Sequence, residues 1–420
     1  MKAILAALAA CALCTPQAAM AQSADSELAL DTGRIDRTLE SFVADGRVAG
    51  AEVLVWQGGA ERHYASAGLA DREAGRPFAR ATQVQLFSMT KPVTGVALMQ
   101  LWEQGRFALD DPLARYLPQF ADVQVYDGTA PDGSFKLRPP SRPITVRDVM
   151  RHTAGFTYGN AGHPTDPVWE DLQPLSPGNT LEKFAELMPR VPLLYDPGTH
   201  WHYSAAADVQ ARLVEVLSGQ PFEDYVAEHV FKPLGMTHSC WKCGPDMLPR
   251  LAAIYRLGVD GKLDRMAEET WLEPNFRGNP LTMGGSGLVT TIDDYMRFAR
   301  MLLGQGELDG VRILQPATVR VMATDQLDPR IEDKDRLWLP SRGSGGFGLD
   351  FFVRTRPPRT ARENRGAVGE FFWDGFTSML FWVDPANDMA VVFATQKVPF
   401  DGTLHHDIRE AVYGAEYTGR

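Results

Sequence analysis

Alternating apolar and polar positions predict strands at the two ends of the chain, with helices between them. Residues 50–57 and 61–69 are two such stretches, and the Gly58-Gly59-Ala60 segment between them is a hairpin signal. Further strands are predicted at 346–354, 366–373, 378–384 and 389–395. Helical spacing predicts helices at 34–45, 88–105, 146–152, 181–188, 205–217, 222–231, 293–303, 316–323 and 404–413. This order favours one sheet with antiparallel pairing, closed by the C-terminal strands and interrupted by a mostly helical insertion.

The helix predicted at 88–105 is apolar around most of its circumference, which is typical of a helix buried in the middle of a large fold. Residues 110–143 are rich in Asp, Pro and Gly and are predicted to form a long connection. We therefore expect an α/β sheet domain, formed by residues 22–115 and 281–420, and a mostly helical region, formed by residues 116–280.

The 420 residues have the composition of an ordinary globular protein, with 44% hydrophobic and 23% charged residues. These values exclude a disordered chain, a collagen-like fibre and a disulfide-rich miniprotein. The formal net charge is -11, and so acidic a chain is not expected to bind nucleic acid by neutralising phosphates.

The N-terminal segment has the pattern of an export signal. Lys2 precedes an apolar run at residues 3–13, and Ala19-Met20-Ala21 offers the small residues that a signal peptidase recognises. We expect residues 1–21 to be removed and the protein to be periplasmic or secreted. The alternative is Leu8-Ala9-Ala10-Cys11, which fits a lipoprotein cleavage box but leaves almost no apolar run before it. No later stretch of the sequence reaches the roughly 18 apolar residues of a membrane span.

Two cysteines, Cys240 and Cys243, lie outside that segment. Their C-x-x-C spacing occurs in a loop-like stretch and not between a strand and a helix, which argues against a redox motif. No further zinc ligand is obvious nearby. We interpret the pair as a small local disulfide or as two thiols without a function.

The strongest chemical signal is Ser88-Met89-Thr90-Lys91. A serine hydroxyl becomes a good nucleophile when a base takes its proton, and residues i and i+3 of a helix share one face. Ser88 therefore has Lys91 beside it and lies at the positive end of the helix dipole. A lysine acts as the base only when burial or nearby positive charge favours its neutral form. The same spacing recurs in Ser239-Cys240-Trp241-Lys242, but no helix follows, so we interpret this copy as chance.

Two weaker signals follow along the chain. Tyr203-Ser204-Ala205 stands at a predicted helix start, from which the phenol reaches a site. Trp373-Asp374-Gly375 stands just before a strand, and Gly375 allows a close backbone approach by a ligand. Taken alone, the first also fits a packed tyrosine and the second an ordinary turn.

The joint order of six segments is more specific than any one of them. They are Phe87-Ser88-Met89-Thr90-Lys91-Pro92, Leu109-Asp110-Asp111-Pro112, Val149-Met150-Arg151-His152-Thr153-Ala154-Gly155-Phe156, Pro197-Gly198-Thr199 leading into Tyr203-Ser204, Gly284-Gly285-Ser286-Gly287-Leu288 and Phe381-Trp382-Val383-Asp384-Pro385. Over residues 35–415 this series resembles the class C β-lactamase-like serine hydrolases, a family shared with low-molecular-weight penicillin-binding proteins and family VIII carboxylesterases. The resemblance implies a β-lactamase/transpeptidase-like α/β (α+β) fold: a central antiparallel sheet flanked by helices, a mostly helical second region, and the site between them.

The resemblance also implies roles for individual residues. Ser88 matches the acylated nucleophile, Lys91 the residue that activates it, and Tyr203 the general base partner of a Tyr-x-Asn motif. Trp373-Asp374-Gly375 falls where the family has Lys-Thr-Gly, His-x-Gly or Trp-Gly-Gly. The backbone N–H groups of Ser88 and Phe376 match the oxyanion hole, which stabilises the charge that develops in acyl transfer. Which of Lys91 and Tyr203 takes the first proton stays open.

Two departures from the family pattern change the expected substrate. Ala205 replaces the amide of Tyr-x-Asn, and Trp373 replaces the cationic lysine that helps to hold a substrate carboxylate. Asp374 then places an acid near that point. We expect Asp374 to repel anionic substrates; the alternative is that a turn holds it away from the substrate. Both departures favour a carboxylesterase that acts on small-molecule esters through an acyl-enzyme on Ser88.

Other activities on the same fold stay open, namely an amide or peptide hydrolase, a weak β-lactamase and an acyltransferase. A non-catalytic binding protein is disfavoured because Ser88, Lys91 and Tyr203 are all present. The absence of Gly-x-Ser-x-Gly excludes an α/β-hydrolase, and His200-Trp201-His202 and His405-His406 lack metal-ligand spacing. We therefore predict neither a metal nor a cofactor. The oligomeric state stays open.

Overall fold

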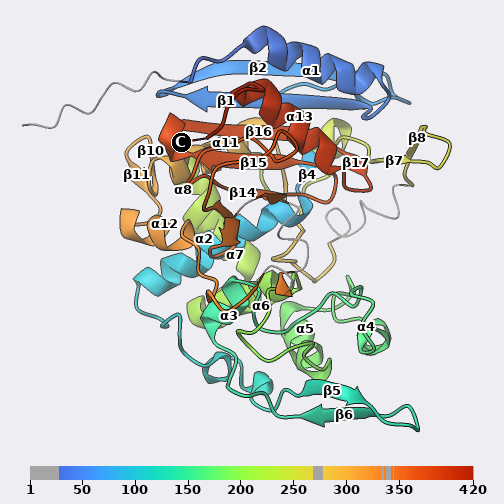
Figure 1. Ribbon diagram of the computed structural model, residues 1–420, viewed down its shortest axis with the longest axis vertical. Coiled ribbons are helices and arrows are strands. Elements are labelled where there is room, and N and C mark those ends of the chain that lie inside the picture. Colours follow the sequence, from blue (N-terminus) through green and yellow to red (C-terminus); the bar gives the residue numbers. More distant parts are fainter. Residues whose placement is uncertain (1–27, 268–277, 333–334, 337–341, 344, 420) are drawn as a thin grey trace, which may run out of the picture.

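The computed structural model describes residues 28–267, 278–332, 335–336, 342–343 and 345–419, and most of its helices and strands are labelled in Figure 1. An antiparallel sheet of eight strands dominates the upper half of that view, in the order β12-β13-β14-β15-β16-β1-β2-β3. Its strands are β1 (Gly50–Gln57), β2 (Ala60–Asp71), β3 (Arg76–Pro77), β12 (Gly345–Phe347), β13 (Phe352–Arg354), β14 (Phe371–Asp374), β15 (Leu380–Asp384) and β16 (Met389–Thr395). Because Ala51 of β1 pairs with Thr395 of β16, strands from the two ends of the chain meet inside the sheet.

Helices cover both faces of this sheet. Helices α1 (Thr32–Ala44) and α13 (Gly402–Tyr413) pack against each other at the top of Figure 1, and α1 lies on β1 and β2. Helix α11 (Ile292–Leu303) packs on β1, β15 and β16. Its Tyr295 ring lies edge-on to Phe381 of β15, with centroids 5.0 Å apart, and its hydroxyl donates to the carbonyl of Met89 at 2.8 Å. Helix α11 thus links the sheet to the turn that carries Ser88.

The mostly helical part lies below the sheet in Figure 1, and helix α2 (Thr90–Glu103) runs between the two parts. This part contains α3 (Val146–Met150), α4 (Asp166–Leu172), α5 (Leu181–Leu187), α6 (Ala206–Ser218) and α7 (Phe222–Val226), whereas α8 (Lys232–Leu234) contacts α11 beside the sheet. Helix α2 packs on α6 and is buried along almost its whole length, as its apolar circumference predicts. Buried apolar side chains of both parts form one continuous core.

The remaining elements are short. They are β4 (Val84–Gln85) paired with β9 (Val289–Thr290), β5 (Val125–Thr129) with β6 (Phe135–Arg138), β7 (Tyr255–Leu257) with β8 (Leu263–Arg265) and β17 (Lys397–Val398), β10 (Glu307–Leu308) with β11 (Val311–Arg312), and helix α12 (Pro316–Met322). Within the described residues, no helix combines the length and the apolar character that a membrane crossing requires.

The predicted antiparallel sheet flanked by helices is confirmed, but some predicted elements are wrong in detail. The single strand expected at 346–354 is a hairpin, because the backbone turns at Asp350, whose φ of 64° lies in the left-handed region. The connection expected at 110–143 contains the β5–β6 hairpin, and helix α4 was not expected. Strand β14 begins at Phe371 and not at residue 366. Cys240 and Cys243 form a disulfide, the first of the two interpretations of that pair.

Candidate active site

Ser88 lies in a single 3-10 turn, Phe87–Met89, that leads directly into α2. Phe87 has a φ of 47°, a left-handed conformation that bulky residues rarely adopt, so the chain turns sharply just before the serine. The Nζ atom of Lys91 donates to Oγ of Ser88 at 3.2 Å and to the carbonyl oxygen of Gly285 at 2.8 Å. Lys91 is only 1% exposed. The structure therefore places the lysine beside the serine hydroxyl, as the helical spacing predicts.

The backbone of Gly284 and Gly285 lies between α2 and α6, and the carbonyl of Gly285 holds the side chain of Lys91. The N–H of Gly285 donates to Oδ1 of Asp208 at 3.1 Å, and the hydroxyl of Thr94 donates to the carbonyl of Gly284 at 2.7 Å. A Cβ atom on Gly284 would lie 2.4 Å from the carbonyl oxygen of Ala207, and one on Gly285 would lie 2.8 Å from Oδ2 of Asp208. Both positions thus require glycine because no space exists for a side chain.

The ring of Tyr203 lies against Nζ of Lys91. Nζ of Lys91 is 4.6 Å from the centroid of the Tyr203 ring and 5.6 Å from that of Tyr158. The indole N–H of Trp373 donates to the hydroxyl oxygen of Tyr203 at 3.4 Å, and the two ring centroids are 5.4 Å apart. The structure thus brings Ser88, Lys91, Tyr203 and Trp373 together at one point, although their sequence positions span most of the chain.

Burial shifts the titration of several groups around Lys91. Loss of solvent raises the pKa of Asp208 to about 6, although the positive charge of Lys91 opposes this rise. Burial raises the pKa of Asp350 to about 8 against the hydrogen bond from Gln210 and the charge of Lys91. The pKa of His152 is held well below its usual value by burial and by the lysine. At neutral pH His152 and most of Asp350 are therefore uncharged.

Asp374 is paired with Arg342, which weakens the repulsion expected between its carboxylate and an anionic substrate, and its effect on substrates stays a prediction. Nε of Arg342 donates to Oδ2 of Asp374 at 2.9 Å and Nη2 donates to Oδ1 at 3.1 Å, so the guanidinium compensates the carboxylate charge. The two side chains are 19% and 6% exposed. Asp374 lines the site, and whether it meets a substrate stays a prediction.

Gly375 and Phe376 lie next to the turn that carries Ser88. A Cβ atom on Gly375 would stand 2.6 Å from the carbonyl oxygen of Leu86, and the rings of Phe376 and Phe87 are 5.9 Å apart. This close approach suits an oxyanion hole formed by the backbone N–H groups of Ser88 and Phe376. Their catalytic role stays a prediction.

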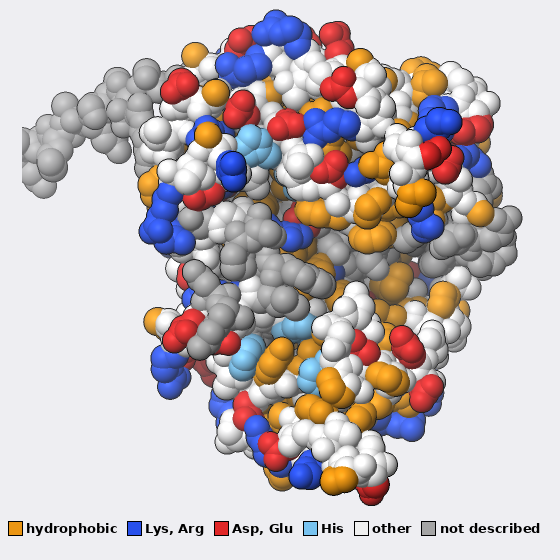
Figure 2. Space-filling view, turned by 45° about the vertical axis from the view of Figure 1, so that its right-hand side comes forward, with side chains coloured by type: hydrophobic (Ala, Val, Ile, Leu, Met, Phe, Trp, Pro, Cys, Tyr) orange, Lys and Arg blue, Asp and Glu red, His pale blue; other side chains and the backbone are white. Residues whose placement is uncertain are grey.

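A cavity of about 540 Å³, the catalytic cavity, opens over Ser88, and aromatic side chains form much of its wall. It is lined by Ser88, Tyr158, Asn160, Trp201, Tyr203, Ser286, Arg342, Trp373, Asp374, Phe376 and Phe400. Figure 2 shows hydrophobic side chains gathered on the face where the sheet-bearing and helical parts meet. Tyr158, Asn160, Trp201, Arg342 and Phe400 were not predicted from the sequence as site residues. For Tyr158 the nearest signal was the segment ending at Phe156, two positions before it.

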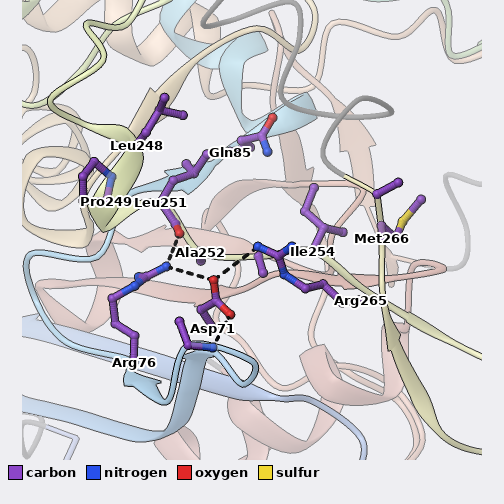
Figure 3. A pocket seen from close by; sticks show the side chains of 13 residues that line it. Asp71, Arg76, Gln85, Leu248, Pro249, Leu251, Ala252, Ile254, Arg265 and Met266 are labelled. Atoms are coloured by element: carbon purple, nitrogen blue, oxygen red, sulfur yellow. Dashed lines mark hydrogen bonds and ion pairs between the residues drawn. The ribbon is translucent and has the colours of Figure 1, made fainter.

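A second hollow of about 300 Å³ lies beside β3, β7 and β8, and Figure 3 shows its lining side chains. Asp71 faces two arginines there, with Oδ2 3.7 Å from Arg76 and 3.3 Å from Arg265. One carboxylate faces two arginines in this hollow, and the described residues that line it include no serine, cysteine or histidine. The catalytic cavity is therefore the stronger candidate for chemistry.

The other sequence signals lie elsewhere. The hydroxyl of Ser239 donates to Asp294, and Lys242 pairs with Glu223, so the second Ser-x-x-Lys copy does not form a serine–lysine pair. His200 stacks on Tyr195, with ring centroids 3.8 Å apart. In the parts of the chain that the structure describes, no three His, Cys, Asp or Glu side chains are grouped as metal ligands.

A central antiparallel sheet flanked by helices, with a Ser-x-x-Lys pair whose lysine is buried and a tyrosine that lines the same cavity, defines the class of β-lactamase-like serine enzymes. The β-lactamase family model matches residues 35–415, and the chain belongs to this family. This result confirms the resemblance stated from the sequence.

Named relatives cover nearly the whole chain. Protein Rv1367c of Mycobacterium tuberculosis is 34% identical over 370 residues, 88% of this chain and 90% of that protein. Lovastatin esterase of Penicillium rubens is 30% identical over 399 residues, 90% of this chain and 96% of that protein. The solved structure of EstCE1, described as a hydrolase with promiscuous acyltransferase activity, matches with a TM-score of 0.75 and 26% identity, over 91% of this chain and 98% of that one.

Proposed function

We propose that the protein is an exported serine carboxylesterase that cleaves small-molecule esters through an acyl-enzyme on Ser88. The observation that carries the proposal is the contact between Ser88 and Lys91 under an aromatic cavity that also contains Tyr203. The similarity to lovastatin esterase and to the hydrolase EstCE1 supports ester cleavage. The export signal at residues 1–21 supports a periplasmic or secreted location.

The geometry supports a two-step reaction. Oγ of Ser88 attacks the ester carbonyl carbon while its proton passes to Lys91 or Tyr203, since Nζ lies within hydrogen-bond distance of Oγ. The N–H groups of Ser88 and Phe376 stabilise the oxyanion. The tetrahedral intermediate then collapses, and the alcohol leaves with the transferred proton. Water, activated by the same base, attacks the acyl-enzyme and releases the carboxylic acid and the serine.

Three features favour an ester over a β-lactam or a peptide with a free carboxylate. Ala205 offers no side-chain amide. Trp373 carries no charge and directs its N–H to Tyr203. The nearby cation, Arg342, is held by Asp374. A substrate carboxylate therefore finds no uncompensated positive charge among these three side chains.

The test is turnover and covalent labelling of the mature protein. We expect hydrolysis of p-nitrophenyl butyrate, little hydrolysis of a chromogenic cephalosporin, and labelling by a serine-directed phosphonate. Ser88→Ala is expected to abolish turnover and labelling. Ser239→Ala, which alters the other Ser-x-x-Lys copy, is the matched control and is expected to keep both. Labelling that persists in Ser88→Ala would move the nucleophile to another residue.

Acyl transfer to an alcohol is the second candidate, and the described activity of EstCE1 supports it. Transfer differs from hydrolysis only in the acceptor that attacks the acyl-enzyme. Adding a primary alcohol to the esterase assay distinguishes the two. A transferase forms the new ester in preference to the free acid, whereas a hydrolase releases mainly the acid.

A further inference from the structure

A further cavity of about 660 Å³, here named the side cavity, lies directly beside the catalytic cavity and is distinct from the hollow beside β3. Arg342, Asp374 and Phe400 line both of them. The two cavities are therefore neighbours, and these three side chains stand at their common boundary.

The side chain of Arg342 at this boundary is held by several contacts. The two parallel hydrogen bonds between Arg342 and Asp374 form the bidentate geometry that makes such pairs both strong and directional. The guanidinium carbon of Arg342 also lies 5.0 Å from the ring centroid of Phe400 and 5.8 Å from that of Trp373. The side chain is thus held by a carboxylate and by two rings at once.

One part of the side-cavity wall is aromatic and uncharged. Side chains alternate along a strand, so Phe372 and Asp374 of β14 share one face while Trp373 points to the other, towards Tyr203. Phe400 and His405 meet edge-on at 5.0 Å. Burial lowers the pKa of His405 to about 4, so this ring is neutral at pH 7. This part of the wall suits an apolar group. The rest of the lining is polar and includes Asn364 and Thr403 as well as the charged or titratable side chains of Arg362, Glu363, His406 and Asp407.

We propose that Arg342 and Asp374 form a partition that sets the length of ester the enzyme accepts, and that the side cavity is a subsite for the distal apolar end of long esters. With the pair closed, the catalytic cavity holds a short ester. The end of a longer acyl or alcohol group enters the side cavity only when the pair separates and loses its two charge-assisted hydrogen bonds. This inference rests on the proposed esterase function and adds a limit on substrate length to it.

The experiment compares kcat/KM for short and long esters in the wild type and in Arg342→Ala. One series lengthens the acyl group, from p-nitrophenyl acetate to laurate, and a second lengthens the alcohol of acetate esters, which shows which half of the substrate uses the side cavity. We expect the long-to-short ratio to rise in one series by about fourfold for each methylene newly buried. Asp374→Asn keeps the side-chain size and is expected to raise the same ratio by less.

The matched control is Arg330→Ala. Arg330 makes the same bidentate pair with Asp328, at 2.9 Å and 2.6 Å, but its side chain is 90% exposed. We expect this variant to leave the ratio unchanged.

The outcomes separate the two proposals. A ratio in Arg342→Ala that stays within twofold of the wild type in both series, at an unchanged melting temperature, overturns the partition alone. If Arg342→Ala does not fold, an unchanged ratio in Asp374→Asn overturns it by the same criterion. A wild-type protein without turnover of any ester overturns the proposed function and the partition with it.

Discussion

Replacing Asp350 with asparagine is expected to raise the free energy of unfolding above that of the wild type, by an amount that grows as the pH rises. Asp350 is buried at the turn between β12 and β13, with a φ of 64°. Its Oδ1 accepts a hydrogen bond from Gln210 at 3.0 Å, whereas Oδ2 accepts none from the described residues. Asparagine has the same shape, keeps an acceptor for Gln210 and tolerates the left-handed conformation. The substitution therefore removes the ionisable group at position 350 with little change in side-chain shape, backbone conformation or the hydrogen bond from Gln210.

The direction of this pH dependence follows from the pKa of Asp350 in the unfolded state and its pKa in the folded state. Burial raises the pKa of Asp350 from 3.8 to about 8, so the folded state holds this proton more tightly than the unfolded state does. Below about pH 4 the carboxyl is protonated in both the folded and the unfolded state, so its ionisation costs no stability. As the pH rises towards 8 the unfolded state loses this proton first, and the free energy of unfolding falls. At about 1.4 kcal/mol per unit, the cost of ionising the buried carboxyl is at most roughly 6 kcal/mol. The asparagine variant avoids that cost.

The assay is urea unfolding of both proteins from pH 5 to pH 9. We expect the difference in free energy of unfolding to grow with pH in favour of Asp350→Asn. Asp388→Asn is the control, because Asp388 is also left-handed, with a φ of 45°, but is exposed. A constant difference between wild type and Asp350→Asn across the range would refute the reasoning.

Three further predictions concern the site and the N-terminus. Lys91→Ala and Tyr203→Phe are each expected to lower kcat by about 100-fold or more with an unchanged circular dichroism spectrum, since general acid–base assistance is typically worth about 10²–10⁴-fold; a near wild-type rate in Tyr203→Phe would remove the phenol from the proton path. Gly285→Ala is expected to lower the esterase rate at least tenfold, because the new Cβ would lie 2.8 Å from Asp208 and 3.4 Å from Nζ of Lys91; a variant that folds and keeps full activity would show that the lysine needs no such support. The exported protein is expected to begin at Gln22, which intact mass tests; a lipid-modified Cys11 would establish the lipoprotein alternative.

The sequence predicts most of the sheet because strand periodicity is local. The β12–β13 hairpin was not predicted because residues 346–354 are mostly apolar, and this outweighed Gly348 and Asp350, which are both compatible with a turn. The β5–β6 hairpin was missed because Asp, Pro and Gly dominate the segment around its short strands. The proposed division of the chain near residues 115 and 280 stays a prediction.

The site was predictable where a helix fixes the spacing, as for Ser88 and Lys91. It was not predictable where the partner comes from a distant loop. Arg342 lies 32 residues before Asp374, and any of the chain's many arginines satisfies the requirement that a buried carboxylate be paired. The arginine that pairs with Asp374 was therefore not predictable, although every residue of the motif was identified.

The pairing of β1 with β16 has a consequence for how the enzyme is made. Residue 51 meets residue 395, so the sheet is completed only when nearly the whole polypeptide is available, and contacts of such long sequence separation form slowly. Helix α11, whose Tyr295 holds the Met89 carbonyl beside the nucleophile, packs on these two strands. A nascent or truncated chain that ends before Met389 carries Ser88 and Lys91 but lacks the strand that completes their support. The support of the turn that carries Ser88 is therefore complete only once the chain has been synthesised past residue 395.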